Sequence, residues 1–129
     1  MLTFVDTSVW VSFFRGRSIT LVTELRRLLE EDRVALAAPT RVELLCGART
    51  SEQGRLTRVL GAVPTFRPTD ATWVELDRWA LLAASRGHVF GFGDLLIGAI
   101  ASENGGLIWS LDSDFVRLQS LGLVRMPAR

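Results

Sequence analysis

The sequence predicts an α/β protein, a three-layer α/β/α sandwich with a central, mostly parallel sheet. Short apolar runs alternate with longer amphipathic stretches along the chain, which is the pattern of successive βα units. The runs are hydrophobic throughout, as expected for parallel strands that are covered on both faces. Right-handed crossovers between such strands place helices on both sides of the sheet.

The first part of the chain predicts one strand and two helices. Residues 2–6 form an apolar run, and Thr7 and Ser8 after it are residue types that cap helices. The helix that they start is expected to end at Arg15, because a glycine follows. Residues 18–32 carry leucines at helical spacing opposite a charged face, so they predict the second helix.

The middle of the chain predicts two more strands and two helices. Residues 34–38 are apolar and form the expected second strand. A proline then starts a helix over residues 39–49, and a further helix over residues 52–60 ends before a glycine. Residues 63–66 are the expected third strand.

The last part predicts three helices and two strands. A Thr-Asp pair starts an amphipathic helix over residues 69–86, and a Gly-Phe-Gly sequence introduces a helix over residues 94–103. Residues 107–111 predict a fourth strand, residues 115–121 a short helix and residues 123–126 a last strand. No repeat or linker divides the chain, so residues 1–129 are expected to form one domain.

The amino-acid composition argues against a disordered chain and against a membrane-spanning protein. The 129 residues are 48% hydrophobic and 22% charged, and no apolar run approaches the roughly 20 residues of a membrane-spanning helix. Asp6 interrupts the first apolar stretch, so no secretory signal is predicted and a cytoplasmic protein is expected. Cys46 and His88 are the only residues of their types, so a bound metal would be held by oxygen, which favours Mg²⁺ or Mn²⁺. No partner for His88 is visible in the sequence, which argues against a catalytic histidine.

All fifteen basic residues are arginine. The absence of lysine argues against a P-loop ATPase, a Schiff-base enzyme and a phosphoaspartyl receiver, each of which uses one. The net charge of +1 does not by itself indicate a nucleic-acid binder. Six arginines are nevertheless candidates for a local phosphate-binding patch, with ordinary solvated side chains as the alternative: Arg15, Arg17, Arg41, Arg49, Arg55 and Arg58.

Four acids stand in apolar surroundings, namely Asp6, Glu43, Asp94 and Asp112. Burying an unpaired carboxylate costs several kcal/mol, so convergence on a shared cation is the simplest explanation. The predicted fold supports this, because two of the acids end strands and two lie near helix starts that can share the same sheet edge. Taken singly, each aspartate could instead cap a helix, and the glutamate could point to solvent.

The local sequences around these acids resemble the four motifs of the PIN domain. In chain order they are Asp6-Thr7-Ser8 after an apolar strand, Glu43-Leu44-Leu45-Cys46-Gly47, Asp94-Leu95-Leu96-Ile97-Gly98-Ala99 and Ser110-Leu111-Asp112-Ser113-Asp114-Phe115. The resemblance covers essentially the whole chain. The length and the closeness of all four motifs are similar to those of the VapC toxins of bacterial toxin–antitoxin pairs.

This resemblance implies a Mg²⁺- or Mn²⁺-dependent endoribonuclease of PIN-like fold. It implies that Asp6, Asp94 and Asp112 bind the metal, the last directly or through water, and that Glu43 orients a water or accepts a proton.

Neighbouring polar residues are expected to support these acids. The hydroxyls of Thr7, Ser8 and Ser110 would hold the carboxylates by hydrogen bonds. Asp114 would either assist Asp112 or cap the following helix.

The resemblance also implies partners: RNA as substrate, a small VapB-like antitoxin and a second copy of the chain in a homodimer. Four aromatic residues are candidates for apolar contacts with a partner protein: Trp10, Phe13, Phe14 and Trp73.

Two other functions compete with this interpretation. A phosphomonoesterase of the haloacid-dehalogenase kind would need an Asp-x-Asp motif after the first strand and a lysine, and the chain has neither. A PIN-like module that binds RNA or a partner without cutting is the other alternative. The intact set of acids argues against it, and a divalent-metal titration would distinguish the two.

Overall fold

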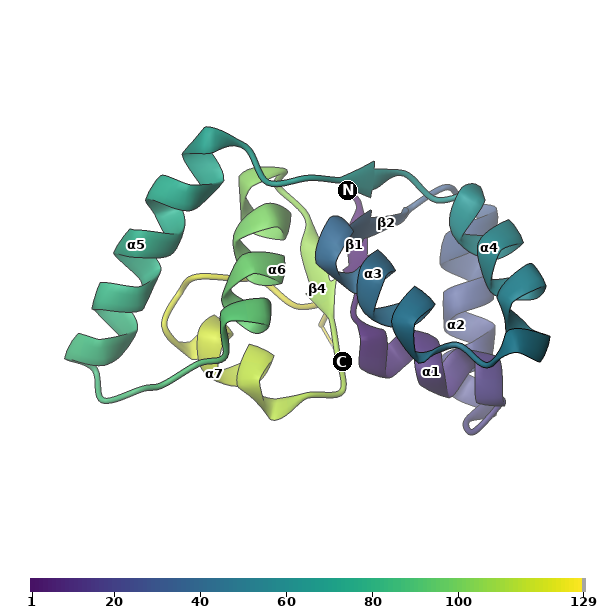
Figure 1. The fold of residues 1–129 in the computed structure, drawn as a ribbon. Helices are drawn as coiled ribbons and strands as arrows, with labels where there is room; N and C mark the ends of the chain where they lie inside the picture. Colours follow the sequence, from purple (N-terminus) through teal and green to yellow (C-terminus); the bar gives the residue numbers. More distant parts are fainter. Residues whose placement is uncertain (129) are drawn as a thin grey trace.

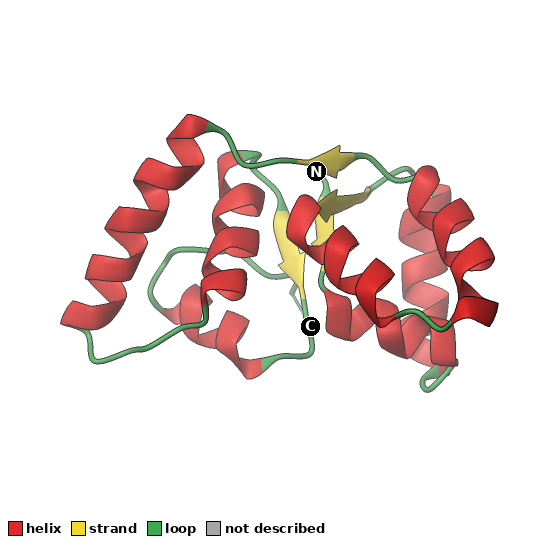
Figure 2. Cartoon of the chain, in the orientation of Figure 1, coloured by secondary structure: helices red, strands yellow, loops and turns green. Residues whose placement is uncertain are grey.

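A computed structural model describes residues 1–128 of the chain. The described part contains four strands, seven α-helices and a short 3₁₀ helix (Figures 1 and 2). In chain order these elements are β1 (Thr3–Val5), α1 (Thr7–Arg15), α2 (Ile19–Glu30), β2 (Val34–Ala37), α3 (Ala38–Gly47), η1 (Thr50–Glu52), α4 (Gln53–Gly61), β3 (Thr65–Phe66), α5 (Asp70–Ser85), α6 (Phe92–Glu103), β4 (Leu107–Trp109) and α7 (Ser113–Ser120).

The four strands form one parallel sheet in the order β3-β2-β1-β4. Helices cover both faces, so the predicted three-layer α/β/α sandwich is confirmed. Figure 1 shows α5, α6 and α7 on one side of the sheet and α1, α2 and α4 on the other. All four strands point the same way, so their carboxyl ends lie at one edge.

Two cores lie on the two faces of the sheet, because successive strand residues point in opposite directions. Phe4 and Ile108 pack in one core, with residues of α5, α6 and α7. Val5 and Trp109 pack in the other, with residues of α1, α2 and α4. Trp10 and Phe13 belong to this second core, with 0% and 7% of their surface exposed. Their predicted role as partner contacts is therefore wrong, because no partner can reach them.

Several helix ends follow from local chemistry. Gly16 adopts the left-handed conformation, with φ of 62°, and ends α1 where predicted. Ser18 caps α2 by accepting a hydrogen bond from the Leu21 amide at 3.2 Å. Thr69 and Thr72 form a reciprocal capping box at the start of α5. These caps fix where the chain leaves and re-enters the helical layers.

The predicted strand over residues 123–126 is wrong. Among the described residues this segment forms no strand, and a single hydrogen bond, from the Ile108 amide to the Arg125 carbonyl at 2.8 Å, links it to β4. Leu123 and Val124 are buried in the core, so apolar contacts rather than a ladder hold the segment. The hydrophobic residues of this segment are therefore explained by their burial in the core and not by pairing in the sheet.

Other boundaries shift by a few residues. The strand β4 ends at Trp109 rather than at residue 111, and β3 comprises only Thr65–Phe66. The helix α6 starts at Phe92, two residues before the expected position, with Gly91 as its N-cap. Asp94 therefore lies inside the first turn of α6 and does not cap it. No helix of the described chain is long and apolar enough to cross a membrane.

Candidate functional site

Two neighbouring strands bring the first and fourth motifs together. Asp6 directly follows β1, and Ser110 directly follows β4, which is paired in parallel with β1. A backbone hydrogen bond from the Asp6 amide to the Trp109 carbonyl, 2.9 Å long, continues this pairing to the end of the strands. The predicted meeting of these segments at one sheet edge is confirmed.

Asp6 is buried, with 7% of its surface exposed, and two hydroxyls stabilise it. Its Oδ2 accepts hydrogen bonds from Ser8 Oγ at 2.9 Å and from Ser110 Oγ at 2.8 Å. Asp6 occupies the N-cap position of α1, but its side chain does not cap that helix. The capping explanation for this residue is therefore excluded, and its carboxylate is held in place by the two serines.

Backbone amides fix the direction of both serine hydroxyls. Ser8 Oγ accepts from the Leu111 amide at 3.0 Å, and Ser110 Oγ accepts from the Asp112 amide at 2.9 Å. A hydroxyl has only one proton to donate, and here both protons go to Asp6. The two serines thus connect the buried carboxylate to the backbone of the fourth motif, as their predicted supporting role requires.

Three other carboxylates gather beside this pair of strands. Asp94, Asp112 and Asp114 each offer one oxygen, and these three oxygens all lie within 4.8 Å of one another. Asp94 and Asp114 are half-buried, and Asp112 is exposed. Asp6 does not belong to this tight group, although its charge reaches Asp94. Of the four predicted acids, only Asp6 is buried.

The roles within the fourth motif differ from the expected ones. Asp112, not Asp114, is the N-cap of α7, and its Oδ1 accepts from the Asp114 amide at 2.9 Å. Asp114 instead accepts a hydrogen bond from Arg117 at 2.8 Å and interacts with Asp94. The suggestion that Asp114 serves as the helix cap is wrong, because its side chain faces the neighbouring acid.

The pKa of Asp94 is raised to about 7. Burial is the largest cause, followed by the hydrogen bond with Asp114 and the negative charges of Asp112, Asp114 and Asp6. The pKa of Asp114 is lowered, mainly by Arg117 and then by the hydrogen bond with Asp94. The opposite pKa shifts favour a proton on Asp94 beside an ionised Asp114. A divalent cation would relieve the same repulsion.

Glu43 lies on α3, outside this group, and its carboxylate feels the charge of Asp6. Thr7 Oγ1 donates a hydrogen bond to Glu43 Oε1 at 3.3 Å. The Glu43 side chain is largely exposed, yet partial burial of its carboxyl group raises its pKa. The bond from Thr7 lowers the pKa, and the charge of Asp6 raises it. Thr7 thus contacts Glu43 as a supporting residue, whereas Glu43 lies in the second turn of α3 and not in the first turn as expected.

Arg117 is a site residue that sequence reasoning missed. Its guanidinium binds Asp114, the Val89 carbonyl at 3.2 Å and His88 Nδ1 at 3.1 Å, and it lies 4.3 Å from the ring centroid of Phe90. His88 therefore has a partner that the sequence did not reveal. The sequence does contain a pattern that could have identified Arg117: an Asp and an Arg three residues apart on a helix lie on the same face and can form an ion pair.

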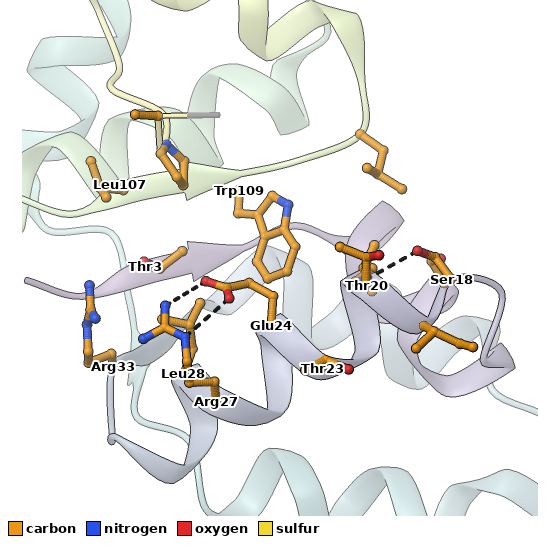
Figure 3. Close-up of a pocket in the computed structure, with 16 residues that line it drawn as sticks. Thr3, Ser18, Thr20, Thr23, Glu24, Arg27, Leu28, Arg33, Leu107 and Trp109 are labelled. Atoms are coloured by element: carbon orange, nitrogen blue, oxygen red, sulfur yellow. Dashed lines mark hydrogen bonds and ion pairs between the residues drawn. The ribbon is translucent and has the colours of Figure 1, made fainter.

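One cavity lies away from the acids, and another has Glu43 in its wall. A cavity of about 910 Å³ lies between α2 and the sheet, lined by residues that include Thr3, Arg27 and Trp109 (Figure 3). None of the five acids lines it. A second cavity of about 390 Å³ is lined by Thr7 and Glu43. Of the five acids, only Glu43 lines this second cavity.

Comparison with known proteins agrees with these motifs. The family model of the PIN domain matches residues 3–121. Over 116 residues, the chain is 34% identical to ribonuclease VapC11 of Mycobacterium tuberculosis and to a VapC ribonuclease of Mycobacterium bovis, which covers 86% of this chain and 87% of each relative.

The fold is similar to that of solved toxin–antitoxin structures. The crystal structure of VapBC2 from Rickettsia felis, bound to a DNA fragment from their promoter, matches with a TM-score of 0.79 and 13% identity, covering 98% of both chains. VapBC-1 from nontypeable Haemophilus influenzae matches with a TM-score of 0.79 and 20% identity, covering 98% of this chain and 97% of the other. At these identities the likeness concerns the fold alone.

Proposed function

The chain belongs to the VapC ribonucleases of the PIN-domain family, and on this basis we propose that it is the toxin of a type II toxin–antitoxin pair that hydrolyses RNA with a divalent cation. The observation that carries the proposal is the gathering of Asp94, Asp112 and Asp114 within 4.8 Å beside the buried Asp6. Carboxylate oxygens are the ligands that Mg²⁺ and Mn²⁺ prefer.

The donor set fits such a cation. The pKa of Asp94 is raised first by burial and then by its hydrogen bond with Asp114 and the neighbouring negative charges, and a cation would neutralise those charges. Asp6, Asp94 and Asp112 would hold the metal. Asp114 adjoins Asp94 and would assist. When bound, the cation would supply an activated water and would stabilise negative charge on the phosphate during hydrolysis.

The protein's own residues would position the reacting groups. Ser8 and Ser110 both donate to Oδ2 of Asp6 and so restrict the rotation of its carboxylate. Glu43 would accept the proton of the attacking water while one P–O bond of the phosphodiester breaks. Its raised pKa suits this role, because a base is most effective when its pKa approaches the working pH.

A direct experiment tests this function. RNA cleavage by the purified protein is measured with Mg²⁺, with Mn²⁺ and with EDTA, and five-prime ends in total RNA are mapped after brief expression. Asp6→Asn is expected to abolish cleavage. Asp77→Asn is the matched control, because Asp77 is an exposed acid on α5. Cleavage that persists undiminished in EDTA would contradict the metal mechanism. A protein that binds RNA but never cuts it would support the non-catalytic alternative.

We also propose a small antitoxin of the VapB kind as partner. Its support is the family membership together with the fold shared with solved VapBC complexes. A pull-down from the native host is expected to recover the antitoxin, and its co-expression is expected to suppress toxicity. Since RNA and antitoxin are both made in the cytoplasm, we expect the protein to act there. Harmless overexpression and a pull-down without a partner would together contradict the toxin assignment.

A homodimer is the third part of the proposal. Trp73 and Phe92 stack with ring centroids 6.1 Å apart, although 46% and 61% of their surfaces are exposed. Exposed stacked aromatics of this kind are typical of contact surfaces. Of the four aromatic residues predicted as contacts, two remain accessible to a partner. Trp73 is exposed and Phe14 is half-buried.

A further inference from the structure

The cavity of about 390 Å³ beside the acids lies between α1, α3 and the segment of η1 and α4. Figure 1 shows α3 and α4 joined by the loop that carries Arg49. Thr7 and Glu43, which are hydrogen-bonded to each other, form part of the wall. The cavity therefore adjoins the residues proposed to handle the attacking water, and a ligand in it would lie next to the reacting phosphate.

Arginines dominate the charge of this cavity. Of the six arginines that the sequence suggested as a patch, Arg15, Arg49 and Arg55 line it, whereas Arg17, Arg41 and Arg58 do not. Two glutamates also line it, Glu43 and Glu52. Three of the six arginines predicted as a phosphate-binding patch therefore line the same cavity.

The guanidinium groups of the cavity remain available for an anion. Within residues 1–128, neither Arg15 nor Arg55 forms a salt bridge. Arg49 has only a loose contact with Glu52 at 3.7 Å, and its side chain is 81% exposed. The Arg55 guanidinium lies 5.2 Å from the ring centroid of Phe14, so a cation–π contact holds it in place while its N–H groups can still donate to an anion. Such donors suit a phosphate, which arginine binds through two parallel hydrogen bonds.

Apart from Ser51, the rest of the wall is apolar and includes Val11, Phe14 and Leu56. A volume of about 390 Å³ is within the range of small-ligand pockets, which begins at about 300 Å³. An apolar wall beside unpaired arginines matches the two parts of a nucleotide, because a base buries an apolar face while its phosphate needs cations.

We propose that this cavity is a nucleotide subsite that binds the RNA next to the scissile bond. Arg15 and Arg55 bind the backbone phosphate, and the apolar wall receives the nucleoside. The inference rests on the proposed ribonuclease function and adds a substrate contact to it. RNA is favoured over a protein segment as occupant because the wall includes Glu43, so the same strand can pass from the reacting phosphate into the cavity.

Binding measurements test the subsite without cleavage. The dissociation constant for a fluorescent single-stranded RNA is measured at several salt concentrations in an Asp6→Asn background, which prevents turnover. Arg15→Gln and Arg55→Gln are each expected to raise the dissociation constant about threefold to tenfold. Each should also reduce the slope of log affinity against log salt by about 0.7, the value for one phosphate contact on a single strand. Arg26→Gln, on the exposed side of α2, is the matched control.

The outcomes separate the subsite from the function. Dissociation constants and salt slopes equal to those of the control would overturn the subsite, even when the parent protein cleaves RNA in a metal-dependent way. Variants that bind RNA normally but lose capture of the antitoxin would also overturn it and would assign the cavity to the protein partner. A parent protein without metal-dependent cleavage would overturn the proposed function itself.

Discussion

Arg117 and Asp114, three residues apart on α7, form an ion pair with Nη2 and Oδ1 separated by 2.8 Å. The same guanidinium binds the Val89 carbonyl and His88, in the segment that leads to α6. Since Asp94 lies in the first turn of α6, Arg117 connects the two elements that bring the aspartates together. We infer that it positions the carboxylates rather than contacting substrate.

The first prediction concerns this arginine. Arg117→Gln is expected to weaken Mn²⁺ binding about threefold to tenfold, because Asp114 loses the guanidinium that ties it to the segment before α6 and so fixes it beside Asp94. The free energy of unfolding should also fall, by about 1 kcal/mol, because the half-buried side chain loses its hydrogen bonds to Asp114 and to the Val89 carbonyl. Isothermal titration with Mn²⁺ and urea unfolding measure the two effects. Arg78→Gln is the control, because Arg78 pairs with Glu75 at the same spacing on α5, away from the aspartates. Equal Mn²⁺ affinities in both variants would refute the positioning role.

The second prediction concerns pH and metal binding. Asp94 has a pKa of about 7 without metal, and a metal ligand must lose its proton. Mn²⁺ affinity should therefore fall by up to about tenfold for each pH unit below 7 and should level off above it. Titrations between pH 5.5 and pH 8.5 would measure this profile. An affinity independent of pH across this range would show that Asp94 is not a ligand.

The third prediction concerns stability without metal. The pKa of Asp94 is higher in the folded state than its ordinary value of 3.8, so the folded state binds the proton more tightly. The stability that Asp94 contributes is present below pH 4 and is lost as pH rises to about 7. In EDTA, Asp94→Asn should therefore become more stable relative to the parent protein as pH rises from 4 to 7. Urea unfolding at pH 4.5 and pH 8 measures the difference. A gap between the two proteins that stays constant with pH would contradict the raised pKa.

The fold was predictable because it depends on hydrophobic periodicity and on local helix ends. The parallel sheet and the αL glycine after α1 both follow from short-range chemistry. The segment at residues 123–126 was not predictable in the same way. A buried apolar run and a strand look alike in sequence, and only the tertiary contacts of Leu123 and Val124 distinguish them.

The sequence was sufficient to predict which residues belong to the candidate site, but not which contacts these residues make. Asp6 and its serines follow from motif and strand position, and the structure places them together. Which aspartate caps α7 depends on where the helix begins: a start at residue 115 would make Asp114 the N-cap, whereas α7 begins at Ser113 and Asp112 caps it. Trp10 and Phe13 were misassigned for a related reason, because an aromatic side chain suits a core and a contact surface equally well.

The fourth prediction concerns the proposed homodimer. Trp73→Glu should shift the protein to monomer, because it places a charge in the exposed stack with Phe92. Light scattering coupled to size-exclusion chromatography would measure the mass at fixed concentration. Leu81→Glu is the control, since Leu81 is 74% exposed on the same helix. A dimer that survives Trp73→Glu would place the interface elsewhere.

The last prediction separates the roles of Glu43, Asp112 and Asp114. Glu43→Gln should lower the single-turnover rate at least 100-fold with little effect on Mn²⁺ affinity, because a general base contributes about that factor without binding the metal. Asp112→Asn should weaken Mn²⁺ binding and slow cleavage. Asparagine still caps helices, so this variant removes the charge of Asp112 and keeps the start of α7.

Asp114→Asn should have a smaller effect than Asp112→Asn, because Arg117 already neutralises much of the Asp114 charge. The interaction with Asp94 nevertheless makes some loss of Mn²⁺ affinity expected. Single-turnover rates across a Mn²⁺ titration give rate and affinity for all three variants separately. An inactive Asp114→Asn beside an active Asp112→Asn would reverse the assignment within the fourth motif, since the ligand would then be the residue paired with arginine and Asp112 would serve only as the helix cap.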